Sequence, residues 1–184
     1  MIMRLNWAVD GCATVRFAGV GIYSQRKETK SMGAQERFTS LVDEPAAIAK
    51  PAGLYQPCLV VGGFAYVSGH LPVLPDGSLI LGCLGRDLEV EDGKAAARRA
   101  GLASLVTLEQ ALGSLDAVKR VVKLFGMVAA TGSFTQHPAV VNGCSELYAE
   151  VWGNENGVGV RSALGVASLP AGVAVEIEAV FELN

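Results

Sequence analysis

The sequence predicts an α+β fold in which a mixed sheet carries two helices packed on one face. Short β-rich runs lie on both sides of two longer stretches with helical spacing of small and aliphatic residues. In addition, 51% of the residues are hydrophobic although only 7% are aromatic. Runs of strands interrupted by two helices favour helices segregated on one side of a sheet. A core of Val, Leu, Ile and Ala suits such closely packed layers.

Residues 1–31 differ from the rest of the chain and are interpreted as an N-terminal extension. Basic residues outnumber acidic ones there, and no hydrophobic periodicity is visible. One interpretation is a targeting segment for the mitochondrion or another organelle. The other is sequence upstream of a natural start at Met32, which would leave a cytoplasmic protein. In either case residues 32–184 are expected to form one domain.

The first part of that domain predicts a short helix and three strands. Residues 36–48 suit a helix, followed by an irregular loop with two prolines. Residues 59–61 and 64–68 predict a hairpin around Gly62-Gly63. A Pro-Asp-Gly turn at 75–77 then leads into a predicted short strand at 78–81.

The second part predicts two helices and three strands. Small and aliphatic residues recur every three or four positions over 91–112, and Gly113 follows as a C-cap. The remaining elements are a strand at 118–130, a helix at 138–152 begun by a proline, and strands at 160–169 and 173–183. With both helices on one face, the other face stays apolar, and we expect a closed oligomer to bury it.

Composition narrows the classes of function. The net charge is −3 and no basic patch emerges, which argues against nucleic-acid binding. Four widely spaced cysteines and two histidines supply few metal ligands, so a zinc site is not expected. No apolar run reaches the length of a membrane span, so a membrane partner is not expected.

Arg161 is the most informative single residue. It begins a strand otherwise made of small and aliphatic residues, where a guanidinium needs an anionic partner. Glu176 and Glu178 lie on one face of the next strand, because side chains alternate along a strand. From the residues alone, Arg161 either pairs with one of these glutamates in a structural salt bridge or binds a carboxylate ligand.

Four motifs occur in a fixed order between residues 51 and 183. They are Gly-Leu-Tyr (53–55), Tyr-Val-Ser-Gly-His-Leu-Pro (66–72), Val-Asn (141–142), and Arg-Ser-x₃-Val-x₂-Leu-Pro followed by Val-Glu-Ile-Glu-Ala (161–170 and 175–179). Together they resemble the Rid family, also called YjgF or endoribonuclease L-PSP. The resemblance implies a chorismate-mutase-like fold and a barrel-like homotrimer with clefts between subunits. It also implies cofactor-free hydrolysis of 2-imino acids or their enamines to 2-keto acids and ammonia.

The resemblance also implies a role for each matching residue. Arg161 would clamp the carboxylate of the substrate, and Glu176 would position the attacking water. The remaining implied contacts with the substrate come from Tyr55, Ser68, Gly69 and Asn142.

Several positions depart from the family pattern. His70 stands where many deaminating members have Gln, Ala163 where they have Cys, and Leu54 where they have Pro. His70 is interpreted either as a strand-end residue near the site or as a surface imidazole. His137, before a proline, is expected to be structural.

Two other functions compete with deamination. One is a non-enzymatic regulatory module that binds small carboxylates in the same cleft. The other is the ribonuclease or translation-inhibitor activity with which the family is often labelled, against which the acidic composition speaks.

Overall fold

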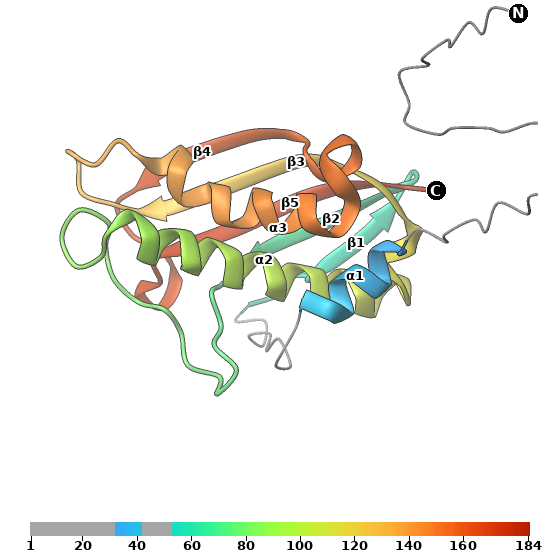
Figure 1. The fold of residues 1–184 in the computed structure, drawn as a ribbon. Coiled ribbons are helices and arrows are strands. Elements are labelled where there is room, and N and C mark those ends of the chain that lie inside the picture. Colours follow the sequence, from blue (N-terminus) through green and yellow to red (C-terminus); the bar gives the residue numbers. More distant parts are fainter. Residues whose placement is uncertain (1–31, 42–52) are drawn as a thin grey trace, which may run out of the picture. The chain divides into compact units, whose positions relative to one another are not determined.

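Five strands form one mixed sheet in the order β1-β2-β5-β3-β4 (Figure 1). The protein is represented by a computed structural model that describes residues 32–41 and 53–184. β3 and β4 run parallel and the other neighbouring strands are antiparallel. The strand bounds are β1 Cys58–Val61, β2 Phe64–His70, β3 Val118–Ala129, β4 Val160–Val166 and β5 Val175–Leu183. This arrangement confirms the predicted α+β fold.

Two long helices, α2 (Val90–Leu112) and α3 (His137–Gly157), cover one face of the sheet (Figure 1). A third and shorter helix, α1 (Ala34–Leu41), packs against α3. Arg37 of α1 donates through Nε to the carbonyl oxygen of Val151, at 2.6 Å, so α1 is attached to the C-terminal half of α3. The helix predicted over 36–48 is therefore present up to Leu41, and its remaining part lies outside the described residues.

The predicted hairpin turn at Gly62-Gly63 and the predicted helix C-cap at Gly113 are both confirmed. Gly62 and Gly63 have φ values of 60° and 80°, which a two-residue hairpin of this twist requires and which glycine adopts without strain. α2 begins with a capping box between Glu89 and Asp92 and ends at Gly113, which is left-handed with φ 79°.

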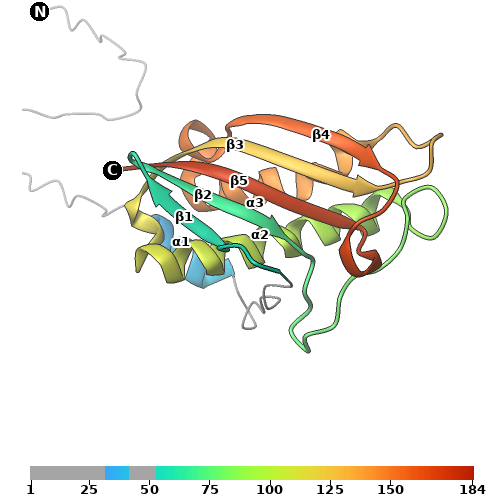
Figure 2. The same ribbon diagram turned by 180° about the vertical axis from the view of Figure 1, so that it is seen from behind.

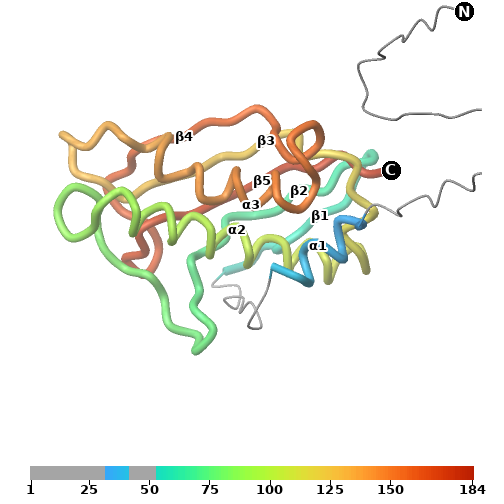
Figure 3. The backbone as a smooth tube through the Cα atoms, viewed as in Figure 1, coloured from blue at the N-terminus to red at the C-terminus, as the bar shows by residue number. Residues whose placement is uncertain are grey.

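The strand predicted at 78–81 is wrong. This segment forms only isolated bridges, Val73 with Leu79 and Leu81 with Val173. Asp76 accepts hydrogen bonds from both the backbone N–H and the hydroxyl of Ser78, so the chain turns locally instead of extending along a neighbour. The result is the long excursion between β2 and α2 that is traced in Figure 3.

The hydrophobic core lies between the sheet and the helices. Alternate residues of β5, from Val175 to Phe181, are buried against α2 and α3. Tyr148 and Trp152 of α3 pack around the ring of Phe181, with ring centroids 5.6 and 5.5 Å from it. Both aromatic residues are buried.

The opposite face of the sheet has no helix over it in residues 32–41 and 53–184 (Figure 2). We call it the open face. Several large apolar side chains on this face are half to two-thirds exposed: Leu59, Val61, Tyr66, Val160 and Leu164. Several large exposed apolar side chains on one face of a sheet are typical of an interface.

Residues 1–31, where the sequence predicts an extension, lie outside the described residues, as does the loop over 42–52. Among the helices of the described ranges, none combines the length and the apolar character needed to cross a bilayer.

Candidate functional site

Arg161 lies on the helix-covered side of β4, the strand at one edge of the sheet. The sheet register pairs Leu124 of β3 both with Arg161 and with Ala179 of β5. Because Leu124 and Ala179 are buried beneath the helices, and register partners point to the same side, Arg161 points toward α3. Ala163 and Gly165 follow on the same side of β4, so only small residues lie beside the guanidinium along this strand.

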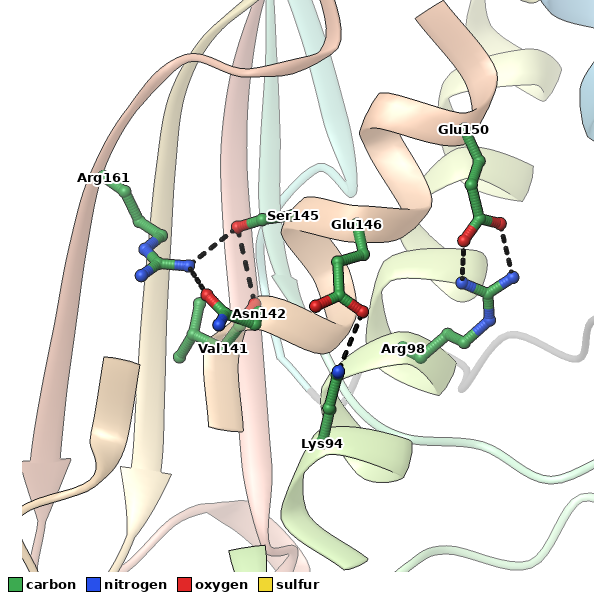
Figure 4. Close-up of polar contacts among 8 residues, drawn as sticks. All are labelled: Lys94, Arg98, Val141, Asn142, Ser145, Glu146, Glu150 and Arg161. Carbon is green, nitrogen blue, oxygen red and sulfur yellow. Dashed lines mark hydrogen bonds and ion pairs between the residues drawn. The ribbon is translucent and has the colours of Figure 1, made fainter. Parts of the chain in front are cut away.

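Two neutral oxygens on α3 hold the Arg161 guanidinium (Figure 4). Nη1 donates to Oδ1 of Asn142 at 2.8 Å and to Oγ of Ser145 at 2.9 Å. Nε and Nη2 have no partner among the described residues, and the side chain is partly buried. A guanidinium fixed through one nitrogen presents its other two donors as a preformed fork for a carboxylate.

The acidic side chains that α3 presents nearest to Arg161 are already paired with cations of α2. Glu146 binds Lys94 at 2.9 Å, and Glu150 binds Arg98 through two contacts of 2.7 and 3.0 Å (Figure 4). Arg161 itself makes no ion pair with any acidic residue in the described part of the chain. The structural salt bridge to Glu176 or Glu178, one of the two sequence interpretations, is therefore wrong for the single chain.

Glu176 lies on the open face. Its neighbours Val175 and Ile177 are buried under the helices, and alternation along β5 turns Glu176 and Glu178 to the other side, as predicted. The Glu176 carboxylate packs directly against Cα of Gly69: a Cβ there would overlap Oε1 and would lie only 2.8 Å from Cδ. A side chain at position 69 would therefore displace the carboxylate that this glycine faces.

Glu176 is a carboxyl group whose surroundings favour the protonated form. Partial burial raises the pKa of Glu176 above its ordinary value, and the negative charge of Glu178 raises it further. A carboxyl group with a raised pKa exchanges protons near neutral pH more readily than a fully solvated one.

Arg161 and Glu176 therefore occupy opposite sides of the same sheet. In the β3 register Arg161 is level with Leu124 and Glu176 with Met127, and a full strand lies between them. Within one chain the two side chains do not face a common space. The sequence predicted both residues as site members, and their separation by the sheet is a finding of the structure.

Ser68 and Gly69 form a bulge at the end of β2. Val67 pairs with Ala179 and His70 with Ile177, so two residues of β2 lie opposite one residue of β5. Ser68 lines a depression of about 470 Å³ on the open face, together with Gln56, Tyr66, Lys123 and Glu178. Bulges of this type often direct backbone groups toward a site.

Tyr55 and Asn142 lie differently with respect to Arg161 and Glu176. Tyr55 lies in the segment before β1, and its side chain is 49% exposed. It makes no hydrogen bond to Arg161 or Glu176, but its exposure leaves it available to line a cleft. Asn142 belongs to the Arg161 group, as the acceptor described above.

His70 is buried, so its interpretation as a surface imidazole is wrong. The side chain is 8% exposed, and both ring nitrogens have partners. Burial lowers the pKa of His70, and the bond to the backbone of Ser68 opposes that shift. His137 begins α3 and packs edge-on against Phe134, consistent with a structural role.

Ser145 and Thr107 are polar contacts that sequence reasoning missed. Ser145 follows Asn142 by three residues, so one turn of helix places both on the same side, and this spacing could have identified it. Thr107 lies in an apolar stretch of α2 and gives no such signal. In the described part of the chain, no three His, Cys, Asp or Glu side chains gather as metal ligands would.

Comparison with known proteins agrees with this fold and these motifs. Residues 36–172 match the family described as "YjgF/chorismate_mutase-like, putative endoribonuclease". A curated relative, Protein TCP17 of Trypanosoma cruzi, is 46% identical over 140 residues, which cover 76% of this chain and 87% of the relative. The chain belongs to the YjgF/chorismate-mutase-like family.

Two solved structures show the same relationship. An endoribonuclease-type structure from Shewanella oneidensis MR-1 superposes with a TM-score of 0.77 at 30% identity, covering 83% of this chain and all of the other. RidA from an Antarctic Psychrobacter species superposes with a TM-score of 0.50 at 28% identity, covering 76% and 94% of the two chains.

Proposed function

We propose that the protein is a hydrolytic deaminase of reactive 2-imino acids and their enamine tautomers. The observation that carries this proposal is the Arg161 guanidinium, held through one nitrogen by Asn142 and Ser145 with two donors left for a ligand. A fork of this shape matches a carboxylate bound through both oxygens. The resemblance of the sequence motifs to the Rid family favours an imine as the group next to that carboxylate.

We propose further that the site is completed between subunits of a homotrimer. Arg161 and Glu176 lie on opposite sides of the sheet, so one substrate can contact both only if they come from different copies. Packing the open faces of three copies together would also cover the exposed apolar side chains there. Glu176 and Gly69 of one copy would then face Arg161 and Asn142 of its neighbour, with Tyr55 closing the cleft.

The chemistry in such a cleft needs one acid–base group. Arg161 binds the carboxylate and orients the C=N bond, while Glu176 accepts a proton as water adds to the imine carbon and delivers a proton to nitrogen. The resulting carbinolamine loses ammonia and leaves a 2-keto acid, so one water is consumed for each imine. An enamine first takes up a proton at carbon and loses one from nitrogen, which converts it into the imine. The raised pKa of Glu176 suits a group that both accepts and donates protons.

The experiment generates the imine in the assay, with an amino-acid oxidase or a threonine dehydratase, and follows its disappearance with and without the full-length protein. We expect the wild type to accelerate the loss. We expect Arg161→Ala to abolish the acceleration, since losing a bidentate charged contact costs about 2–5 kcal/mol of transition-state binding. Arg120→Ala, which removes an exposed arginine of β3, is the matched control.

The alternative functions give different results in the same preparation. Tight binding of 2-keto acids without any turnover of imines would replace the proposal with a regulatory binding module. Cleavage of RNA that survives rigorous purification and disappears in Glu176→Ala would replace it with a nuclease. A monomer in size-exclusion chromatography with light scattering would contradict the site between subunits.

A further inference from the structure

The buried imidazole of His70 connects the bulge of β2 to α2. Nδ1 lies 2.7 Å from the carbonyl oxygen of Ser68, and Nε2 lies 2.7 Å from Oγ1 of Thr107. A carbonyl oxygen only accepts, so Nδ1 must carry the hydrogen. In the neutral ring Nε2 then accepts the hydroxyl hydrogen of Thr107. The two contacts together fix one tautomer.

This contact completes the fixation of Ser68. The backbone N–H of Ser68 donates to the carbonyl oxygen of Pro57 at 3.0 Å, and its hydroxyl donates to that of Gln56 at 2.7 Å. The carbonyl oxygen of Ser68 accepts from His70. Pro57 and Gln56 therefore hold the amide nitrogen and the side chain of Ser68, whereas His70 holds the carbonyl group of the peptide that joins Ser68 to Gly69.

The same peptide determines how Gly69 meets Glu176. A bulged residue has no fixed partner on the neighbouring strand, so its position depends on the contacts of the peptides on either side. Gly69 touches the Glu176 carboxylate so closely that a Cβ would overlap it. A rotation of the Ser68 carbonyl would move Gly69 against or away from that carboxylate.

We infer that His70 is a positioning residue, which holds the Ser68–Gly69 peptide against the Glu176 carboxylate through a tautomer locked by Thr107. This inference depends on the proposed deaminase function for its kinetic consequence, but not for its structural one. His70 points to the helix-covered side and would not touch substrate. Its effect reaches the reaction through the Ser68–Gly69 peptide and the Glu176 carboxylate that this peptide meets.

The test compares three substitutions in the full-length protein. His70→Gln keeps one N–H donor and one oxygen acceptor, whereas His70→Leu fills the volume without either. Thr107→Val removes only the hydroxyl. Ser104→Ala is the matched control, because it removes another buried hydroxyl of α2, which is bonded to Tyr148 of α3 and not to a residue of β2.

Imine turnover should separate these variants. We expect His70→Leu and Thr107→Val to lower kcat by about tenfold or more, with KM changed less than about threefold because Arg161 still binds the carboxylate. His70→Gln and Ser104→Ala should stay within about threefold of wild type in kcat. Wild-type kcat in Thr107→Val and in a folded His70→Leu would overturn the inference.

A second measurement does not need activity. Nitrogen-15 NMR of the imidazole should report the Nδ1–H tautomer in the wild type, and the amide signal of Gly69 should move in Thr107→Val but not in Ser104→Ala. An Nε2–H tautomer, or a Gly69 signal unmoved in Thr107→Val, would overturn the inference. If the wild type turned over no imine, the proposed function would fail by itself, and these spectra would still decide the role of His70.

Discussion

Arg161 and Glu176 lie on opposite sides of one sheet, and each has its own local partners. Arg161 is held by α3 above the edge strand, while Glu176 rests on Gly69 across the open face. A substrate that contacts both must therefore lie between two chains.

Mixed oligomers test this relationship directly. Arg161→Ala and Glu176→Gln should each be inactive alone, but refolding an equal mixture should restore activity. In a randomly assembled trimer, about one quarter of the clefts receive an intact Arg161 from one copy and an intact Glu176 from the next. We expect up to about that share of wild-type activity. Refolded single variants are the controls, and no recovery in the mixture would place the site within one chain.

Removing the supports of Arg161 should weaken binding of the carboxylate more than it slows the reaction. Asn142→Ala and Ser145→Ala each leave Nη1 one acceptor. The remaining acceptor keeps part of the about 1.5–3 kcal/mol that a hydrogen bond to a charged group contributes, so we expect KM to rise about three- to tenfold in each single variant and further in the double variant. Calorimetry with a 2-keto acid checks the same loss without turnover. An unchanged dissociation constant in the double variant would contradict this role.

Replacing Glu176 should separate activity from stability. The raised pKa of this carboxyl group means that folding disfavours its ionised form, so stability falls as pH rises through the folded-state pKa. Glu176→Gln removes that cost and should raise the free energy of unfolding at pH 7 by less than about 1 kcal/mol, because the group is only half buried. Urea denaturation at pH 7 and pH 4 should show the gain at pH 7 only. A destabilised variant at pH 7 would show that the ionised carboxylate stabilises the fold.

His70 should make the protein less stable in mild acid. Its pKa is lowered in the folded state, so below the ordinary value of 6.5 the unfolded chain binds a proton that the folded chain resists. Stability is complete above that pH and falls as pH decreases from 6.5 toward the folded-state pKa, by at most about 1.4 kcal/mol for each pH unit. His70→Gln should remove this part of the slope between pH 7 and pH 5. Equal slopes in the two proteins would contradict a buried neutral imidazole.

Gly143 should be indispensable for the contact between α2 and α3. A Cβ at this position would overlap the carbonyl oxygen of Lys94 and lie 3.1 Å from the backbone nitrogen of Arg98. Because backbone cannot rotate aside, Gly143→Ala should cost about 1–3 kcal/mol. Gly132→Ala, where nothing lies within 4 Å of the new Cβ, should change stability by less than about 0.5 kcal/mol. Thermal unfolding of both variants compares their stabilities, and equal midpoint temperatures would contradict this role of Gly143.

Much of this fold could be predicted from the sequence, because its signals are local. The Gly62-Gly63 turn, the Gly113 cap and the spacing along α2 each depend on neighbouring residues. The strand predicted at 78–81 failed since its β-forming residues could not outweigh the Asp76 side chain that turns the chain beside them.

The candidate residues of the site could be named from the sequence, but their arrangement could not be predicted. Alternation along β5 puts Glu176 and Glu178 on one side of their own strand, yet it says nothing about which side Arg161 takes on β4. That relationship depends on register through β3, which joins residues distant in sequence. The partnership of His70 with Thr107 has the same origin, because it arises only when α2 packs on the sheet.

The two halves of the site also differ in how far apart their components lie along the chain. Asn142 and Ser145 precede Arg161 by 19 and 16 residues, within a single strand–helix–strand unit. Gly69 and Glu176 come from β2 and β5, with almost all of the domain between them. Contacts between nearby residues close smaller loops and form earlier during folding. We therefore expect the contacts of Arg161 with Asn142 and Ser145 to form before β5 pairs with β2 and brings Glu176 against Gly69.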